Sequence, residues 1–355
     1  MIISLLFIIP SKVGGAENYI YNLIDGFNNE GKTNFTLLVD LKYIDHFKKR
    51  FPNNNIISHK IIFQRRVDEL LIFFLNKKLK SFKSYFSPNY ITPFIPLWKK
   101  VKVFTTIHDI QFKFFPEYFN LLKRIWLNFN ISRTLKRSYK TILISNTIKD
   151  QISLIYGVDE KKIKVIHNCV NIRKYKNVKK KKIILSVTAH YPHKNINILV
   201  KSFKKRHSKF KDYKLVIVGQ FSKNLTSTKN NNYITGEDVI LKGYIKQVEI
   251  ENLFNSASLY FTTTLYEGFC MPVVESLMSG VPVLCSDLKI LREVSENRAN
   301  YIKYPKNIDC IVEDLNKSLD KISELKLVSK SNMYYFKQKY SIKNIALSYN
   351  KLFKL

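Results

Sequence analysis

Two carboxylates in the second half of the chain have a spacing that suits a ligand site. Glu267 and Glu275 are separated by seven residues, which read Gly-Phe-Cys-Met-Pro-Val-Val. A strand-like apolar segment, residues 257–264, precedes them, and a Ser-Gly-Val-Pro-Val run at 279–283 follows. A chain that leaves a buried strand, turns at Gly268 and enters a helix presents free N–H groups to an anion. Because eight residues are close to two helical turns, we expect both carboxylates on the same side.

Three further motifs follow strand-like segments. Gly14 and Gly15 come after the apolar N-terminal run and open a helix, so the backbone there can approach a ligand closely. His108 and Asp109 end another apolar run. A lone His is more often structural, and Asp109 could equally cap the next turn. Lys194 follows a strand in the second half, where an ammonium group suits a diphosphate as a point charge.

The elements that must position these residues alternate between strand and helix. A chain of 355 residues is long enough for two domains, and both halves show the βαβ pattern of parallel sheets covered on both faces. A polar, basic stretch around 171–182 is the best linker candidate. We therefore expect an N-terminal domain over 1–172, a second domain over 183–335 and a C-terminal helical segment over 336–355. No repeat of 20–50 residues indicates a solenoid.

Cysteine, histidine and hydropathy patterns narrow the class of protein. The four cysteines form no C-x-x-C pair and no histidine lies at metal-ligand spacing, so we expect reduced thiols, no metal site and no cofactor. The run over residues 1–10 lacks a basic start and a cleavage site, and it is shorter than the ~20 apolar residues that span a bilayer. We expect a cytoplasmic protein, with peripheral attachment to the inner face of the cytoplasmic membrane left open.

The chain is strongly basic, with a formal net charge of +33. Residues 60–140 contain 17 Lys and Arg against four acids. Such a surface can bind nucleic acid, anionic lipid or phosphorylated substrates. Compositional drift is the alternative, because Lys, Asn and Ile are abundant throughout, and we assign about half of the excess charge to it.

Taken in order, these motifs resemble family 4 of the glycosyltransferases, retaining enzymes with the GT-B fold. The E-x7-E block is the specific part of a resemblance that extends from Gly14 to about Glu293. It implies an α/β fold of two Rossmann-like parallel-sheet domains facing a cleft. The C-terminal helix is implied to pack back on the first domain. Since the chain has no D-x-D motif, metal-dependent GT-A chemistry is disfavoured.

The resemblance also implies residue roles. Glu267 and His108 are implied to be catalytic at the donor sugar, and Glu275 to bind the ribose. Family members commonly place an Arg where this chain has Ala189, so the second phosphate cation is open. The implied donor-binding residues are Gly14, Gly15, Lys194, Gly268, Phe269, Cys270, Met271 and Glu275, with Asp109, Asn168 and His190 as further candidates.

The function that follows is metal-independent, retaining transfer of a sugar from a nucleotide diphosphate to an acceptor hydroxyl by a hexosyltransferase. A saccharide or lipid-linked acceptor of surface polysaccharide or lipopolysaccharide assembly is expected. Helices over 68–86 and 118–139 fit amphipathic elements for an anionic membrane, or equally core helices with a solvated basic face. The rivals are another GT-B enzyme, such as an epimerase or phosphorylase, and a basic nucleic-acid-binding protein. No nucleic acid partner is expected, because that reading leaves the ordered motifs unexplained. The donor sugar, its base, the linkage and the oligomeric state are not identified by the sequence.

Overall fold

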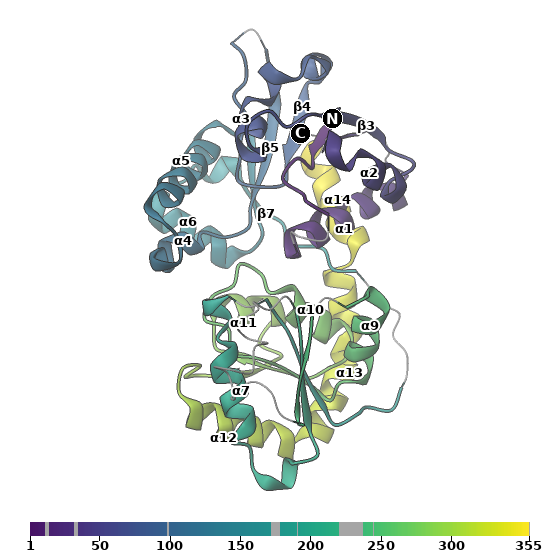
Figure 1. Cartoon of the computed structure of the whole chain (residues 1–355), viewed down its shortest axis with the longest axis vertical. Helices are drawn as coiled ribbons and strands as arrows, with labels where there is room; N and C mark the ends of the chain where they lie inside the picture. The colour runs from purple at the N-terminus through teal and green to yellow at the C-terminus, as the bar shows by residue number, and fades with distance from the viewer. Residues whose placement is uncertain are drawn as a thin grey trace. The chain divides into compact units, whose positions relative to one another are not determined.

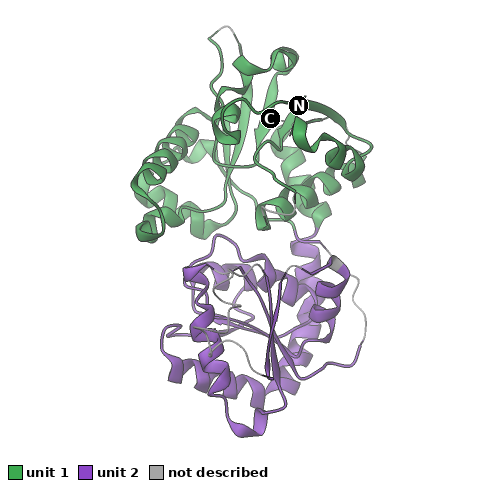
Figure 2. Cartoon of the chain, viewed as in Figure 1, with its two compact units in different colours: residues 1–169, 342–355 green, residues 170–341 purple. Residues whose placement is uncertain are grey.

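The chain forms two compact units, each built on its own parallel sheet (Figure 1). A computed structural model describes residues 1–10, 14–31, 35–97, 99–171, 178–189, 191–219, 237–243 and 245–354. Unit 1 comprises residues 1–169 and 342–355, and unit 2 comprises residues 170–341 (Figure 2). The prediction of an α/β chain with two Rossmann-like parallel sheets is confirmed.

Unit 1 contains a seven-stranded sheet in the order β3-β2-β1-β4-β5-β6-β7, with every neighbouring pair parallel. The inner strands of this sheet are mostly buried, as expected of a parallel sheet that is covered on both faces, whereas the two edge strands are half-exposed. Their bounds are β1 (Ile2–Ser4), β2 (Thr36–Asp40), β3 (Asn55–His59), β4 (Ser84–Ser87), β5 (Lys102–Ile107), β6 (Lys140–Leu143) and β7 (Ile163–Val165). The helices are α1 (Gly15–Asn29), α2 (Ile44–Arg50), α3 (Arg65–Leu75), α4 (Gln111–Phe114), α5 (Leu121–Arg137), α6 (Asn146–Tyr156) and α14 (Ile342–Phe353).

The last helix packs closely on the first within unit 1. A Cβ atom added to Gly26 of α1 would lie 2.7 Å from Ile342 Cγ2 and 2.8 Å from the Cβ of Ala346. The two helices therefore approach each other at a point where only glycine fits. Because α14 supplies Tyr349 and Ala346 to the unit 1 core, the C-terminal residues are part of this unit's scaffold.

The predicted amphipathic helix over 68–86 is wrong. Helix α3 ends at Leu75, a 3₁₀ turn over Lys77–Ser81 follows, and β4 begins at Ser84. The physical reason is local, because the Asn76 side chain accepts a hydrogen bond from the amide of Lys78 (3.1 Å) and so starts a new turn. Leu79 then points into the core, so the apolar residues of this stretch are shared between two elements.

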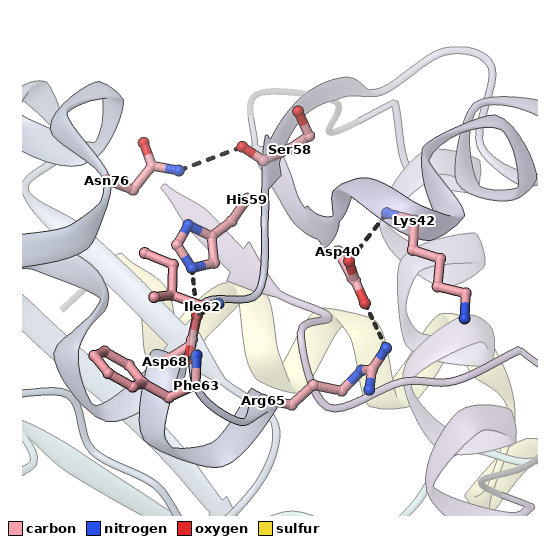
Figure 3. A network of polar contacts seen from close by, with 9 residues as sticks. All are labelled: Asp40, Lys42, Ser58, His59, Ile62, Phe63, Arg65, Asp68 and Asn76. Carbon is pink, nitrogen blue, oxygen red and sulfur yellow. Dashed lines mark hydrogen bonds and ion pairs between the residues drawn. The ribbon is translucent and has the colours of Figure 1, made fainter.

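The loop between β3 and α3 is held by one buried carboxylate (Figure 3). Asp68 accepts hydrogen bonds from the amides of Ile62 (2.7 Å) and Phe63 (2.9 Å), and it pairs with Nε2 of His59 (2.9 Å). Burial acts to raise the pKa of Asp68, but these hydrogen bonds together hold that pKa below its ordinary value. Beside them, Arg65 pairs with Asp40 at the end of β2. The loop is thus fixed at the carboxyl edge of the sheet.

Unit 2 contains a six-stranded parallel sheet in the order β10-β9-β8-β11-β12-β13. Its strands are β8 (Ile183–Val187), β9 (Lys214–Val218), β10 (Val239–Lys242), β11 (Leu259–Thr262), β12 (Val283–Ser286) and β13 (Asn300–Ile302). Its helices are α7 (Ile196–Lys204), α9 (Gln247–Ser256), α10 (Met271–Met278), α11 (Lys289–Ser295), α12 (Ile308–Asp320) and α13 (Ile322–Lys339).

The expected C-terminal helical segment over 336–355 is divided in two. Helix α13 ends at Lys339 and α14 begins at Ile342. The residues between these two helices are bound by Val170. Its amide donates to the carbonyl of Tyr340 (3.0 Å), and it forms a parallel bridge with Ser341. Within the described ranges, no helix has both the length and the apolar character needed to cross a bilayer.

Candidate functional site

The sequence-predicted residues of unit 2 gather at the carboxyl edge of its sheet. Strands β8 and β11 are neighbours, with Ile184 opposite Leu259 and Leu185 opposite Tyr260. The loops that leave these two strands therefore start side by side, although they are far apart in the sequence. In open α/β sheets, ligands bind in the crevice beyond this edge.

Lys194 and Glu267 come together in these loops. Lys194 ends a 3₁₀ turn over Pro192–Lys194, and its Nζ lies 2.7 Å from Oε1 of Glu267. The side chains are 21% and 10% exposed, so the pair is partly desolvated but still in reach of solvent. An ammonium group that is partly desolvated and paired with a carboxylate can also serve a phosphate oxygen.

Backbone and side-chain hydrogen bonds lock the two loops to each other. The carbonyl of His193 accepts from the amide of Leu265 (2.7 Å) and from the hydroxyl of Thr264 (3.3 Å). Asn195, in the left-handed region at φ 55°, donates to the carbonyls of Thr263 (3.2 Å) and Pro305 (2.7 Å). The position of Lys194 is therefore fixed on both sides by the loop that carries Glu267.

Glu275 lies in the second turn of α10 and is buried. The expected helical relation between Glu267 and Glu275 is wrong, because α10 begins only at Met271 and Glu267 precedes it in a loop. The chain bends at Gly268 and Phe269, as expected, and Cys270, with a φ of 66°, then caps the helix in a left-handed conformation. The remaining member of the block, Phe269, is buried and packs edge-on against Tyr340.

Two uncharged side chains flank the Lys194–Glu267 pair. Burial, helped by the nearby charge of Lys194, lowers the pKa of His193 to about 4, so its imidazole is neutral at neutral pH. Burial and the charge of Glu267 raise the pKa of the Cys270 thiol. Since neither side chain adds charge at neutral pH, the Lys194–Glu267 pair is the charged feature that an incoming anion would meet.

In unit 1 the predicted residues also follow the carboxyl ends of strands. Gly14 (φ 63°) caps α1, and a Cβ added at Gly14 or Gly15 would have no atom of the described residues within 4 Å, so those residues leave the space beside this loop open. His108 follows β5, and its Nε2 lies 3.0 Å from the carbonyl oxygen of Pro88. Because a carbonyl only accepts, Nε2 carries the proton; burial lowers the pKa of His108, so Nδ1 of the neutral ring is an acceptor.

A buried chain of hydroxyl groups that sequence reasoning missed lies behind His108. The Tyr19 ring packs edge-on against the His108 ring at 4.9 Å. The Tyr19 hydroxyl lies 2.6 Å from that of Tyr349 and 3.2 Å from that of Thr106. Tyr19 follows the glycine pair by one helical turn, which is a weak signal. Nothing in the sequence connects it with Tyr349, which lies 330 positions away on α14.

The further candidates have different surroundings. Asp109 accepts from the amide of Gln111 (3.0 Å), so its carboxylate closes a turn at the start of α4. Asn168 is buried, and within the part of the chain that the structure describes its Oδ1 has no hydrogen-bond partner. His190 lies outside the described residues, and its neighbour Ala189 offers no charge. Among the described residues, no three His, Cys, Asp or Glu side chains are grouped as a metal site requires.

Family models match both units in turn. Residues 13–174 match the model described as Glycosyltransferase Family 4, and residues 170–332 match that of Glycosyl transferases group 1. The chain belongs to the family 4, group 1 glycosyltransferases. The resemblance drawn from the motifs is therefore confirmed at the level of the family.

Individual relatives and solved structures agree with this assignment. The O-antigen chain mannosyltransferase RfbU of Salmonella typhimurium is 31% identical over 213 residues, or 59% of this chain and 58% of that protein. The match thus spans less than two thirds of the relative's length. Sucrose-phosphate synthase of Thermosynechococcus elongatus shares the fold with a TM-score of 0.78 at 14% identity, covering 99% of this chain and 98% of that one. HepE of Anabaena, solved with UDP and glucose, has a TM-score of 0.76 at 14% identity and 99% coverage of both chains.

Proposed function

We propose that this chain transfers a sugar from a nucleoside diphosphate to an acceptor hydroxyl, with retention at the anomeric carbon and without a metal ion. The observation that carries the proposal is the Lys194–Glu267 pair, 2.7 Å apart beside the start of α10. Departure of an anionic diphosphate is the costly event of such a transfer, and fixed charges aimed at it are the main contribution expected of the site.

The proposed roles follow from chemistry at the carboxyl edge of unit 2. Lys194 turns from Glu267 to the departing diphosphate, aided by the backbone N–H groups at the start of α10, a helix end that favours negative charge. Glu275 accepts hydrogen bonds from the ribose hydroxyls. Glu267, once its ammonium partner is shared with phosphate, accepts from hydroxyls of the donor sugar.

Unit 1 contributes the acceptor side in this proposal. The open backbone at Gly14 and Gly15 admits a ligand close to the start of α1. His108 presents Nδ1 as an acceptor for a sugar hydroxyl, because its Nε2–H is held by Pro88. The name of RfbU as an O-antigen chain mannosyltransferase supports an acceptor of lipopolysaccharide or surface-polysaccharide assembly, with a lipid-linked saccharide at an anionic membrane surface. The presence of UDP and glucose in HepE supports a nucleotide sugar as the donor.

A transfer assay tests the proposal. Labelled UDP- and GDP-sugars are incubated with the protein and a lipid-linked saccharide in EDTA, and the new linkage is examined by NMR. Transfer in EDTA with the donor's anomeric configuration is the expected result. Inversion, or activity that requires an added divalent cation, contradicts the mechanism. Interconversion of the sugar nucleotide without an acceptor would favour an epimerase, and salt-sensitive DNA affinity with no sugar-nucleotide binding would favour a nucleic-acid-binding protein.

A further inference from the structure

A long groove in unit 1 follows α5, which lies within the segment 118–139 that the sequence predicts to be amphipathic. It has a volume of about 1040 Å³ and lies between α5, the segment 92–95 and residues of α4 and η3 (Pro116–Tyr118). It follows α5 from Leu121 to Arg137, which is about 24 Å at the rise of an α-helix. The groove is therefore elongated, with the dimensions of a chain-like ligand rather than of a compact one.

One wall of the groove is an exposed apolar stripe. Leu121, Ile125 and Phe129 recur every four residues on α5, so they share one face of the helix, and they are 66%, 57% and 50% exposed. Phe94 faces the groove from the segment 92–95. Apolar side chains grouped in this way are costly to leave in water, and such patches mark interaction sites.

The charge of the groove is uniformly positive. Five basic side chains line it, and no Asp or Glu does. Among the described residues none of the five forms an ion pair with a carboxylate; they are Lys113, Arg124, Arg133, Lys136 and Arg137. The Arg133 guanidinium donates instead to the carbonyls of Thr92 and Pro93. Its positive charge is therefore not neutralised, and the groove attracts an anion.

Apolar and basic side chains are unevenly distributed along the helix. The apolar stripe occupies residues 121–129, where Arg124 is the cation that lines the groove, and three further cations, Arg133, Lys136 and Arg137, follow in the last turns of α5. An occupant that complements both must have an apolar chain at one end and a negative charge at the other. Leu121 and Ile125 offer no hydrogen-bond acceptors to a peptide backbone and no flat surface to nucleic-acid bases, so neither polymer fits the stripe as well.

We propose that the groove binds one lipid molecule with a phosphate headgroup, its hydrocarbon chain along Leu121, Ile125 and Phe129 and its phosphate at Arg133 and Arg137. The inference rests on the proposed function, in which the acceptor is lipid-linked, and it identifies where the lipid part of that acceptor is held. It differs from attachment to a charged bilayer, because a single lipid molecule binds outside any membrane.

Calorimetric titration of the full chain with farnesyl phosphate, below its micelle concentration, tests the proposal against farnesol and inorganic phosphate. Farnesyl phosphate is expected to bind about tenfold or more tightly than either probe, since each supplies only half of the interaction. Ile125→Glu and Arg137→Ala are expected to weaken its binding about tenfold. The matched controls are Leu154→Glu, at an exposed apolar position of α6 outside the groove, and Lys123→Ala, at an exposed base of α5 that does not line it.

Three results would overturn the groove assignment. The first is equal affinity of the Ile125→Glu and Leu154→Glu variants for farnesyl phosphate. The second is farnesol binding as tightly as farnesyl phosphate. The third is a wild-type dimer that Ile125→Glu dissociates, which would place a second copy in the groove. Nucleotide-sugar binding by the same variants separates this inference from the proposed function. If sugar nucleotides bind and the lipid does not, only the groove assignment fails; if the lipid alone binds, the transferase proposal fails and the groove stands.

Discussion

Neutralising Glu267 is predicted to tighten diphosphate binding while it slows transfer. The Nζ of Lys194 lies 2.7 Å from Oε1 of Glu267, so a diphosphate must compete with a carboxylate for the same ammonium group. Glu267→Gln keeps the size and the acceptor of the side chain but removes its charge. Lys194→Ala removes the group for which the two anions compete, and the remaining carboxylate then repels the diphosphate.

The size of the effect follows from the geometry of the pair. Two unit charges 2.7 Å apart attract by about 6 kcal/mol at an effective dielectric constant of ~20, before the cost of desolvation is subtracted. Net values for hydrogen bonds to charged groups are about 1.5–3 kcal/mol. Since Gln still accepts a hydrogen bond, the Glu267→Gln variant should gain about 1–2 kcal/mol in UDP or GDP affinity, or roughly five- to thirtyfold. Lys194→Ala should lose about 1.5–3 kcal/mol, or about ten- to 150-fold.

Isothermal titration with UDP and GDP measures both affinities, and the double variant gives the coupling between the residues. A matched control is the exposed pair Lys205–Asp309, 3.4 Å apart with side chains 60% and 88% exposed, whose Lys205→Ala variant should leave affinity within about twofold. If Glu267→Gln weakens diphosphate binding as much as Lys194→Ala does, the competition between the two anions is refuted. Glu267 would then be a direct ligand of the leaving group or necessary for the shape of the loop.

Three further predictions concern stability, each measured by reversible unfolding. Tyr349→Phe removes the 2.6 Å hydrogen bond to Tyr19, so it should cost about 1 kcal/mol and lower Tm by about 2–4 °C in calorimetry; an unchanged Tm would mean that this contact contributes nothing. Asp68→Asn should destabilise unit 1 by about 1–3 kcal/mol at pH 7, and the urea midpoints should converge with those of wild type at low pH. Because folding lowers the pKa of Asp68, its carboxylate stabilises the fold above the unfolded pKa of about 3.9, and this stabilisation is lost as the pH falls through the folded pKa. A difference in urea midpoint between wild type and Asp68→Asn that stays constant down to pH 3 would contradict this prediction. Gly26→Ala gains about 1 kcal/mol of helix propensity but forces a Cβ against Ile342 at 2.7 Å, so a net loss of about 0–2 kcal/mol is expected, and a gain in stability would show that α14 moves freely.

Much of the fold was predictable, because alternating apolar segments and glycine-rich turns are local signals of parallel α/β units. The two successive parallel α/β domains expected from this pattern occur as the seven-stranded and six-stranded sheets, and the expected strand over 257–264 occurs as β11. The division of the segment 68–86 into a helix, a 3₁₀ turn and a strand was not predictable in this way. Its apolar residues fit a helical period, but the side chain of Asn76 closes a competing turn, and tertiary packing takes Leu79 into the core.

The candidate site was predictable as a set of residues but not as an arrangement. Each chosen side chain follows a strand, and that rule needs only local sequence. The Lys194–Glu267 contact depends on the adjacency of β8 and β11, a tertiary fact with no local signal. Likewise, the left-handed conformation occurs at Cys270 rather than at Gly268, because Cys270 is the residue that caps α10. The link from Tyr19 to Tyr349 depends on the return of α14 to unit 1.

A thermal-shift screen with sugar nucleotides tests the central claim most directly. The protein is heated in EDTA with UDP-, GDP-, dTDP- and CMP-sugars, and the screen is repeated with Glu275→Ala. Ligand at 100 times its Kd stabilises by about 2.7 kcal/mol, so a selective rise in Tm of about 5–10 °C is predicted for one diphosphate donor, and Glu275→Ala should abolish it. If no sugar nucleotide raises Tm, or if the rise persists unchanged in Glu275→Ala, the proposed donor site at the carboxyl edge of unit 2 is contradicted.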